Sequence, residues 1–87
     1  PELDAVAMLR NEVDVSFDRG NMHGILIETR LNGGPWKYTG RYFISPATIR
    51  IKNGTDLPRY VEIRARYIKD MEPVGQDSDP VSVVITP

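Results

Sequence analysis

The sequence contains no cysteine and only one histidine, His23. Without thiols there is no disulfide framework and no thiolate metal site. A zinc site needs three or four ligands at short spacing, which a single histidine does not supply by itself. A hydrolytic triad needs a base beside a nucleophile, and none of the four serines lies in a Gly-x-Ser-x-Gly turn. We therefore expect no enzyme activity, no metal and no cofactor, and we interpret His23 as a loop residue.

The sequence also lacks long apolar runs and an excess of charge of either sign. No run approaches the roughly 18 apolar residues that a membrane-spanning helix needs. Eleven Lys and Arg residues against twelve Asp and Glu residues leave a formal charge of -1. The chain as a whole therefore exerts no strong attraction on nucleic acid or on acidic membranes. We expect neither a nucleic-acid partner nor membrane insertion.

The chain does have enough apolar residues for one small core. Its 87 residues are 40% hydrophobic and 26% charged, a balance typical of a folded globular domain, and a second core would not fit in this length. The chain begins with Pro1 rather than Met and ends at Pro87. We interpret residues 1–87 as a single, monomeric domain excised from a larger protein.

Seven glycines and seven prolines divide the chain into short segments, a spacing that favours β-strands over helices. Within the segments apolar and polar residues alternate, as in a strand with one buried face. This pattern predicts seven strands, at residues 3–9, 13–17, 25–31, 36–39, 47–52, 61–67 and 81–86. For the first of these a short helical turn is the alternative, because Ala, Leu and Met favour helix.

The segments between these strands carry turn and loop signals. Residues 32–35 (Asn-Gly-Gly-Pro) predict a tight hairpin turn, since Asn and Gly readily adopt positive φ angles. Residues 40–46 are predicted to cross between sheets, residues 53–58 to turn, and residues 69–79 to form a long polar loop. That loop contains four acids, Asp70, Glu72, Asp77 and Asp79. An oxygen-rich loop can hold calcium if it curls around one centre, and a solvated acidic loop is the alternative.

Seven short strands at this density predict an all-β, seven-stranded antiparallel immunoglobulin-like sandwich. The residues predicted to form its core are Val13, Val15, Phe17, Ile25, Ile27, Ile49, Ile51, Val61, Ile63 and Ala65. Trp36 is predicted to border this core beside the hairpin, and Phe43 to pack at its edge. Tyr38 and Tyr42 then remain as the exposed aromatic residues of this region.

The charged residues of the strands are predicted to lie outside. Glu28 and Glu62 can form cross-strand pairs with arginines at positions 30, 64 and 66. Six of the eleven basic residues fall within residues 50–69, namely Arg50, Lys52, Arg59, Arg64, Arg66 and Lys69. In a sandwich the first two belong to one sheet, and Arg64 and Arg66 belong to the other. We therefore expect these residues to divide between opposite surfaces and to form no single basic patch.

Four segments resemble the fibronectin type III family, and together they extend over nearly all of the chain. They are residues 13–18, 25–30, 61–65 and 78–86, which resemble the family's second, third, sixth and last strands. Trp36, after the predicted hairpin turn, resembles the start of the fourth strand. The resemblance implies the same seven-stranded antiparallel sandwich that the alternation predicts.

The sequence departs from the family at the start of the sixth strand. A tyrosine near this point normally hydrogen-bonds the loop before it, but here the corresponding position holds Arg59, and Tyr60 comes one residue later. Either the strand carries a bulge or this corner is absent. Residues 64–79 also resemble fibronectin-like segments of bacterial proteins, which implies a bacterial origin.

The resemblance implies a non-enzymatic spacer or protein-interaction module, whose partner is a neighbouring domain of the parent protein or another protein. The candidate contact residues are Trp36, Tyr38 and Tyr42, because flat rings on a sheet surface seat proteins or stack on sugars. A carbohydrate-binding sandwich that uses these exposed rings is the alternative, and an accessory domain of a hydrolase is a third reading. The sequence assigns no compartment, and an extracellular or cell-surface location is consistent with the resemblance.

Overall fold

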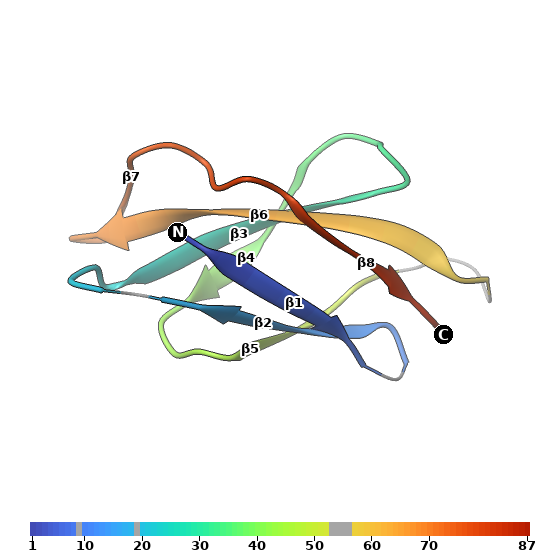
Figure 1. The fold of residues 1–87 in the computed structure, drawn as a ribbon. Coiled ribbons are helices and arrows are strands. Elements are labelled where there is room, and N and C mark those ends of the chain that lie inside the picture. The colour runs from blue at the N-terminus through green and yellow to red at the C-terminus, as the bar shows by residue number, and fades with distance from the viewer. Residues whose placement is uncertain (9, 19, 53–56) are drawn as a thin grey trace.

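The computed structural model describes residues 1–8, 10–18, 20–52 and 57–87 of the chain. These residues form eight β-strands and no helix, arranged in two antiparallel sheets that lie one above the other (Figure 1). The described residues therefore contain no helix that is long and apolar enough to cross a membrane. The all-β fold with two layers was predicted from the alternation of apolar and polar residues.

The smaller sheet has three strands in the order β1-β2-β5. They are β1 (Leu3–Ala7), β2 (Glu12–Phe17) and β5 (Ala47–Arg50). β1 pairs with β2 along its whole length, from Leu3 opposite Phe17 to Ala7 opposite Val13. The strand prediction for this segment is confirmed, and the helical alternative is wrong for residues 3–7.

The larger sheet has five strands, with β4, β3 and β6 side by side and both β7 and β8 on the far edge of β6. They are β3 (Gly24–Leu31), β4 (Lys37–Tyr42), β6 (Arg59–Lys69), β7 (Glu72–Val74) and β8 (Val81–Ile85). The end of β6 pairs with β7, and its beginning pairs with β8. β6 is thus the central strand that positions the side chains of the outer face.

The core lies between the two sheets, where the inward side chains of both layers meet. All ten residues predicted to form it are buried. Ile85 belongs to the same cluster, and Tyr67 packs against it. Ile68 is fully buried but lies outside this cluster. Two-residue alternation identified this core because the predicted core residues of β2, β3 and β6 keep one parity on the inward face.

The prediction for β4 is wrong at both ends. Trp36 lies before the strand, and pairing continues through Tyr42, within the stretch that we expected to cross between sheets. The register shifts between Ile27 and Glu28, because Ile27 lies opposite Gly40 while Glu28 lies opposite Tyr38. The shift leaves one extra residue in β4, which is a β-bulge. Gly40 is therefore part of a strand rather than the start of a loop.

The predicted loop at residues 69–79 contains a strand of its own. Asp70 and Met71 have φ angles of 51° and 68° and form a two-residue turn that folds β7 back onto the end of β6. Residue type did not predict this hairpin, because Met rarely adopts such a φ angle. β7 is the reason why eight strands are found in the described residues and seven were predicted.

Two further expectations concern turns. The turn after β3 is confirmed, since Asn32 and Gly33 have φ angles of 49° and 73°. Of the turn expected at residues 53–58, residues 53–56 lie outside the described residues.

β6 pairs with β3 without a register shift, so the bulge that we considered near Tyr60 is absent from this pairing. The Tyr60 side chain lies on the outer face of the sheet.

Candidate functional site

The outer face of the larger sheet carries two crossed ion pairs. Antiparallel pairing places Arg30 opposite Glu62 and Glu28 opposite Arg64. Arg30 donates from Nε and Nη2 to the two carboxylate oxygens of Glu62, at 2.8 and 3.1 Å. Arg64 donates from Nε to Glu28 at 3.0 Å. The predicted cross-strand ladder is confirmed for these four residues, each of which is half-buried.

Arg66, the third arginine predicted for this ladder, has a different partner. Its Nη2 donates a 2.8 Å hydrogen bond to the carbonyl oxygen of Gly75, in the segment between β7 and β8. The side chain therefore ties that segment to β6. It does not add a third ion pair to the face.

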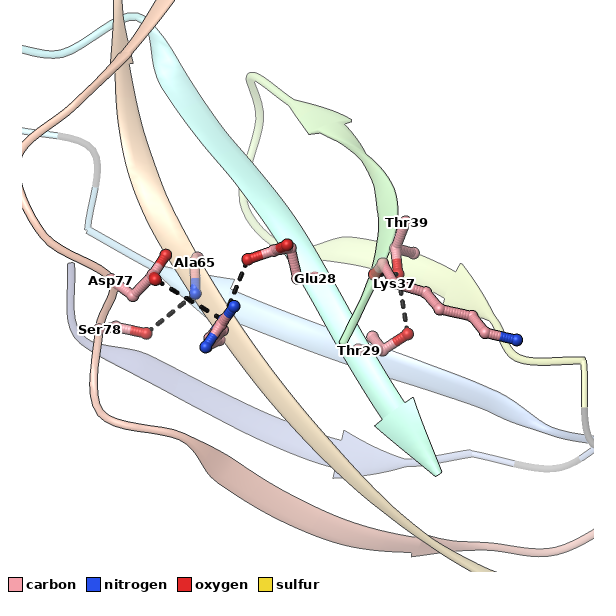
Figure 2. A network of polar contacts seen from close by, with 8 residues as sticks. Glu28, Thr29, Lys37, Thr39, Ala65, Asp77 and Ser78 are labelled. Atoms are coloured by element: carbon pink, nitrogen blue, oxygen red, sulfur yellow. Dashed lines mark hydrogen bonds and ion pairs between the residues drawn. The ribbon is translucent and has the colours of Figure 1, made fainter. Parts of the chain in front are cut away.

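A second carboxylate approaches Arg64 from the segment before β8. Oδ2 of Asp77 lies 3.7 Å from Nε of Arg64, the same atom that donates to Glu28. Glu28 and Asp77 are labelled in Figure 2. Ser78 holds this segment in place, because its Oγ accepts from the Ala65 N–H at 3.0 Å and its own N–H donates to the Ala65 carbonyl at 2.7 Å. These bonds continue the ladder across the gap between β7 and β8.

Glu62 affects the protonation of Arg30 as well as its position. The hydrogen bonds that Arg30 donates to Glu62 raise the pKa of the Arg30 guanidinium above its ordinary value, and the charge of that carboxylate acts in the same direction. Arg30 thus keeps its charge and its conformation. An ordered guanidinium loses little conformational entropy when it contacts another surface.

Trp36 lies on this outer face and stacks on both arginines. The centre of its ring is 4.6 Å from Cζ of Arg30 and 4.2 Å from Cζ of Arg64, within the range of cation–π interactions. The prediction that Trp36 borders the core is wrong. The turn after β3, the green loop at the upper right of Figure 1, rises above the outer side of the larger sheet and leads into β4, which pairs beside β3.

The bulge in β4 explains why the three candidate aromatic residues do not act together. Tyr38 lies opposite the outward Glu28, while Tyr42 lies opposite the buried Ile25. Residues 36, 38, 40 and 42 would share one face in a regular strand, and the extra residue at the bulge divides them. Trp36 and Tyr38 therefore share the outer face, and Tyr42 belongs to the inner one.

Tyr38 and Tyr42 differ accordingly in exposure. Tyr38 is 62% exposed, whereas Tyr42 is half-buried and packs against the core. Burial raises the pKa of the Tyr42 hydroxyl above its ordinary value, and neighbouring Tyr38 adds to this shift. Phe43, which we expected to pack at the edge of the core, is 39% exposed.

Two residues of this surface were not among the candidates. Tyr60 and Val84 lie opposite each other in β6 and β8 and are 45% and 54% exposed. Their parity in β6 and β8 could have identified them, because Tyr60 alternates with the inward Val61. We call the surface formed by Trp36, Tyr38, Tyr60 and Val84 the outer aromatic face.

The chain matches no protein-family model and none of the curated proteins. Its function must therefore be argued from the outer aromatic face and from the rest of the described surface.

Two other candidate features give no site in the described residues. His23 lies in a loop, as predicted, and its Nδ1 accepts from the Asp70 N–H at 3.0 Å, so it supports the turn between β6 and β7. In the described parts of the chain, no three His, Cys, Asp or Glu side chains come together to hold a metal ion. Of the four acids in the predicted loop, Asp77 forms an ion pair with Arg64. The calcium interpretation has no support in this arrangement.

Proposed function

We propose that this protein is a fibronectin type III-like module that binds another protein through the outer aromatic face. The strand order supports the family. If the strands are lettered as in immunoglobulin-like domains, β1, β2 and β5 correspond to A, B and E, and β3, β6 and β8 correspond to C, F and G. The missing tyrosine corner and the hairpin formed by β7 are the points at which this chain departs from the family resemblance.

The observation that carries this proposal is the exposure of Tyr38 beside an ordered stack of Trp36 on two arginines. Tyr, Trp and Arg are the residue types that dominate the binding free energy of protein interfaces. The arginines are already held by carboxylates, so little side-chain entropy remains to be lost on binding. Tyr60 and Val84 extend the surface with apolar area. A domain that only spaced its neighbours would need no such face.

The carbohydrate alternative has less support from the positions of the same rings. Sugars stack on an accessible aromatic face, but the Trp36 ring is already stacked on Arg30 and Arg64. Tyr42 packs against the core. Only Tyr38 among the three candidates offers a largely exposed ring, which is a small platform for a saccharide.

Site-specific photo-crosslinking tests the proposal directly. A benzophenone side chain is placed at Tyr38 in one variant and at Val6 in another, and both are irradiated in the cells that produce the protein. Val6 is a matched control, because it is 55% exposed and lies on the smaller sheet. We expect one discrete adduct with a protein from position 38 and none from position 6. The absence of any adduct from position 38, or the same adducts from both positions, contradicts the proposal.

A titration with saccharides tests the alternative. Trp36 is the only tryptophan, so its fluorescence reports on the stack without interference from other indoles. We expect no saturable change with mono- or oligosaccharides. Saturable binding that is abolished by Tyr38→Ala would favour the carbohydrate reading instead.

A further inference from the structure

A groove of about 460 Å³ opens along one side of the molecule, between the β4 edge of the larger sheet and the end of β5 in the smaller sheet. Both strands are edge strands, since each pairs with one neighbour only in the described sheets. The groove therefore lies where the two layers are open rather than inside the core. It is lined by Thr29, Arg30, Leu31, Pro35, Lys37, Tyr38, Thr39, Arg50, Ile51, Lys52 and Arg59.

All the charged side chains that line this groove are basic. Five of its eleven lining residues are Lys or Arg, and none is Asp or Glu, although the whole chain has a formal charge of -1. We expected Arg50 and Lys52 to lie on the opposite surface from Arg64 and Arg66, and neither Arg64 nor Arg66 lines the groove. Arg59, the remaining arginine of that run, does line it, so part of the run gathers in one basic groove. Arg30 and Lys37 join it because the open side of the sandwich brings both sheet edges together.

Some of the basic side chains of the groove form ion pairs with carboxylates, and two form none among the residues that the structure describes. Arg30 is held by Glu62, and Arg50 lies 3.4 Å from Glu12 in a largely exposed pair. Lys37 and Lys52 are exposed and form no ion pair within the part of the chain that the structure describes. The Lys37 ammonium group points away from the strand in Figure 2. These two lysines are the charges that remain available to a ligand.

The groove also offers apolar and backbone contacts. Leu31, Pro35 and Ile51 contribute apolar surface, and Tyr38 lines the groove as well. The free edge of β4 presents backbone N–H and C=O groups that pair with no strand of the described chain. Such an edge can accept an added strand through main-chain hydrogen bonds.

We propose that this groove binds an extended, acidic peptide segment of a partner protein, which adds to the edge of β4. An added strand points every second side chain to the same side, so carboxylates at alternating positions would face Lys37 and Lys52. Charge complementarity favours an acidic partner, and the free edge favours a peptide over a compact anion. This inference does not depend on the outer aromatic face as the binding surface for a protein.

Fluorescence anisotropy with a labelled eight-residue peptide that alternates Glu and Val tests this inference. We expect saturable binding that weakens as salt is raised from 50 to 300 mM, because exposed charges are screened. Lys37→Glu and Lys52→Glu should each weaken binding at least fivefold. Lys69→Glu is the matched control, because it changes the net charge equally and lies at the opposite end of β6 from Arg59. It should change the affinity less than twofold.

Three results would overturn the inference. The first is equal weakening by the Lys69 variant and the two groove variants, which would indicate attraction to overall charge alone. The second is displacement of the peptide by an equal concentration of inorganic phosphate, which would indicate a site for small anions. The third is tighter binding of a single-stranded oligonucleotide than of the peptide. Circular dichroism of each variant excludes misfolding as the cause of a lost affinity.

Tyr38 lines the groove and also belongs to the outer aromatic face, so a benzophenone side chain at Tyr60, which is exposed and does not line the groove, separates the two surfaces. Absence of peptide binding together with a discrete crosslink from position 60 would reject the groove and keep the outer aromatic face. Peptide binding without a crosslink from position 60 would support the groove and reject that face.

Discussion

Cζ of Arg64 lies 4.2 Å from the centre of the Trp36 ring, on the outer face of the larger sheet. The same guanidinium donates to Glu28, so the ring, the cation and the carboxylate form one ordered surface feature. The Trp36 ring therefore packs on arginine side chains of the outer face and not inside the core. Stability measurements on Trp36 variants can distinguish these two positions.

Replacement of Trp36 by alanine should lower the free energy of unfolding by only about 1 kcal/mol, because an exposed cation–π stack and partial burial are lost without a core cavity. A tryptophan in the core would cost about 3–5 kcal/mol when truncated. Urea denaturation followed by circular dichroism measures the difference. A loss in the higher range would place the ring in the core after all.

Replacement of Ile63 by alanine should be much more destabilising, since this side chain is fully buried in the centre of β6. We expect a loss of about 2–5 kcal/mol from the cavity and the lost burial. Val84→Ala is the control on the neighbouring strand, and because Val84 is exposed it should change stability by less than about 0.5 kcal/mol. Equal denaturation midpoints for the two variants would show that the inward parity of β6 is wrong.

Replacement of Gly24 by alanine tests a close approach of two chain segments. A Cβ at this position would collide with the backbone carbonyl oxygen of Tyr42 and would lie 2.7 Å from the Phe43 ring. The strand must shift to relieve this contact, and we expect a loss of about 2 kcal/mol or more. Gly20→Ala meets no atom within 4 Å and has only the strain of a φ angle of 56°, which costs about 1 kcal/mol. Thermal unfolding of both variants gives the comparison, and a Gly24 variant as stable as the wild type would contradict the packing of β3 against β4.

The partly buried hydroxyl of Tyr42 should make stability depend on pH in the alkaline range. Its pKa is raised in the folded protein, so the folded state keeps the phenolic proton at pH values where the unfolded chain has lost it. This contribution is fully present below about pH 10 and is lost as the pH rises through the raised pKa.

Tyr42→Phe should therefore reduce the fall in the free energy of unfolding above about pH 10. Tyr38→Phe removes only the smaller contribution to the raised pKa of Tyr42, so it should reduce that fall less than Tyr42→Phe does. Urea denaturation at a series of pH values measures both slopes. Parallel curves for the wild type and the Tyr42 variant would show that this hydroxyl is not desolvated by folding.

The sequence predicted the core and failed at the candidate site for related reasons. Alternation places Val15, Ile27 and Ile63 correctly, because β2 pairs with β1 and β5, and β3 with β6, without a register shift. In β4 the bulge reverses the parity between Tyr38 and Gly40, and composition gives no signal for it. Tyr38 is exposed as predicted, whereas Tyr42, which was expected to be exposed with it, packs against the core.

The hairpin of β7 and the basic groove were also beyond sequence reasoning. The turn at Asp70 and Met71 uses positive φ angles without a glycine, which local propensity does not predict. Lys37 and Lys52 line the same groove although they come from segments of different sheets. The spacing of residues along the chain does not predict which edges of two packed sheets lie next to each other. Contacts of this kind follow from the packing of layers and not from periodicity.

Nuclear Overhauser effects from the Trp36 indole protons test the central claim of this account most directly. The structure predicts cross-peaks to the side-chain protons of Arg30 and Arg64, with those arginine protons shifted upfield by the ring. It predicts none to the methyl groups of Ile27 or Ile49, which are buried in the core. Cross-peaks from the indole to these methyl groups, and none to the arginines, would contradict the outer aromatic face and the function proposed for it.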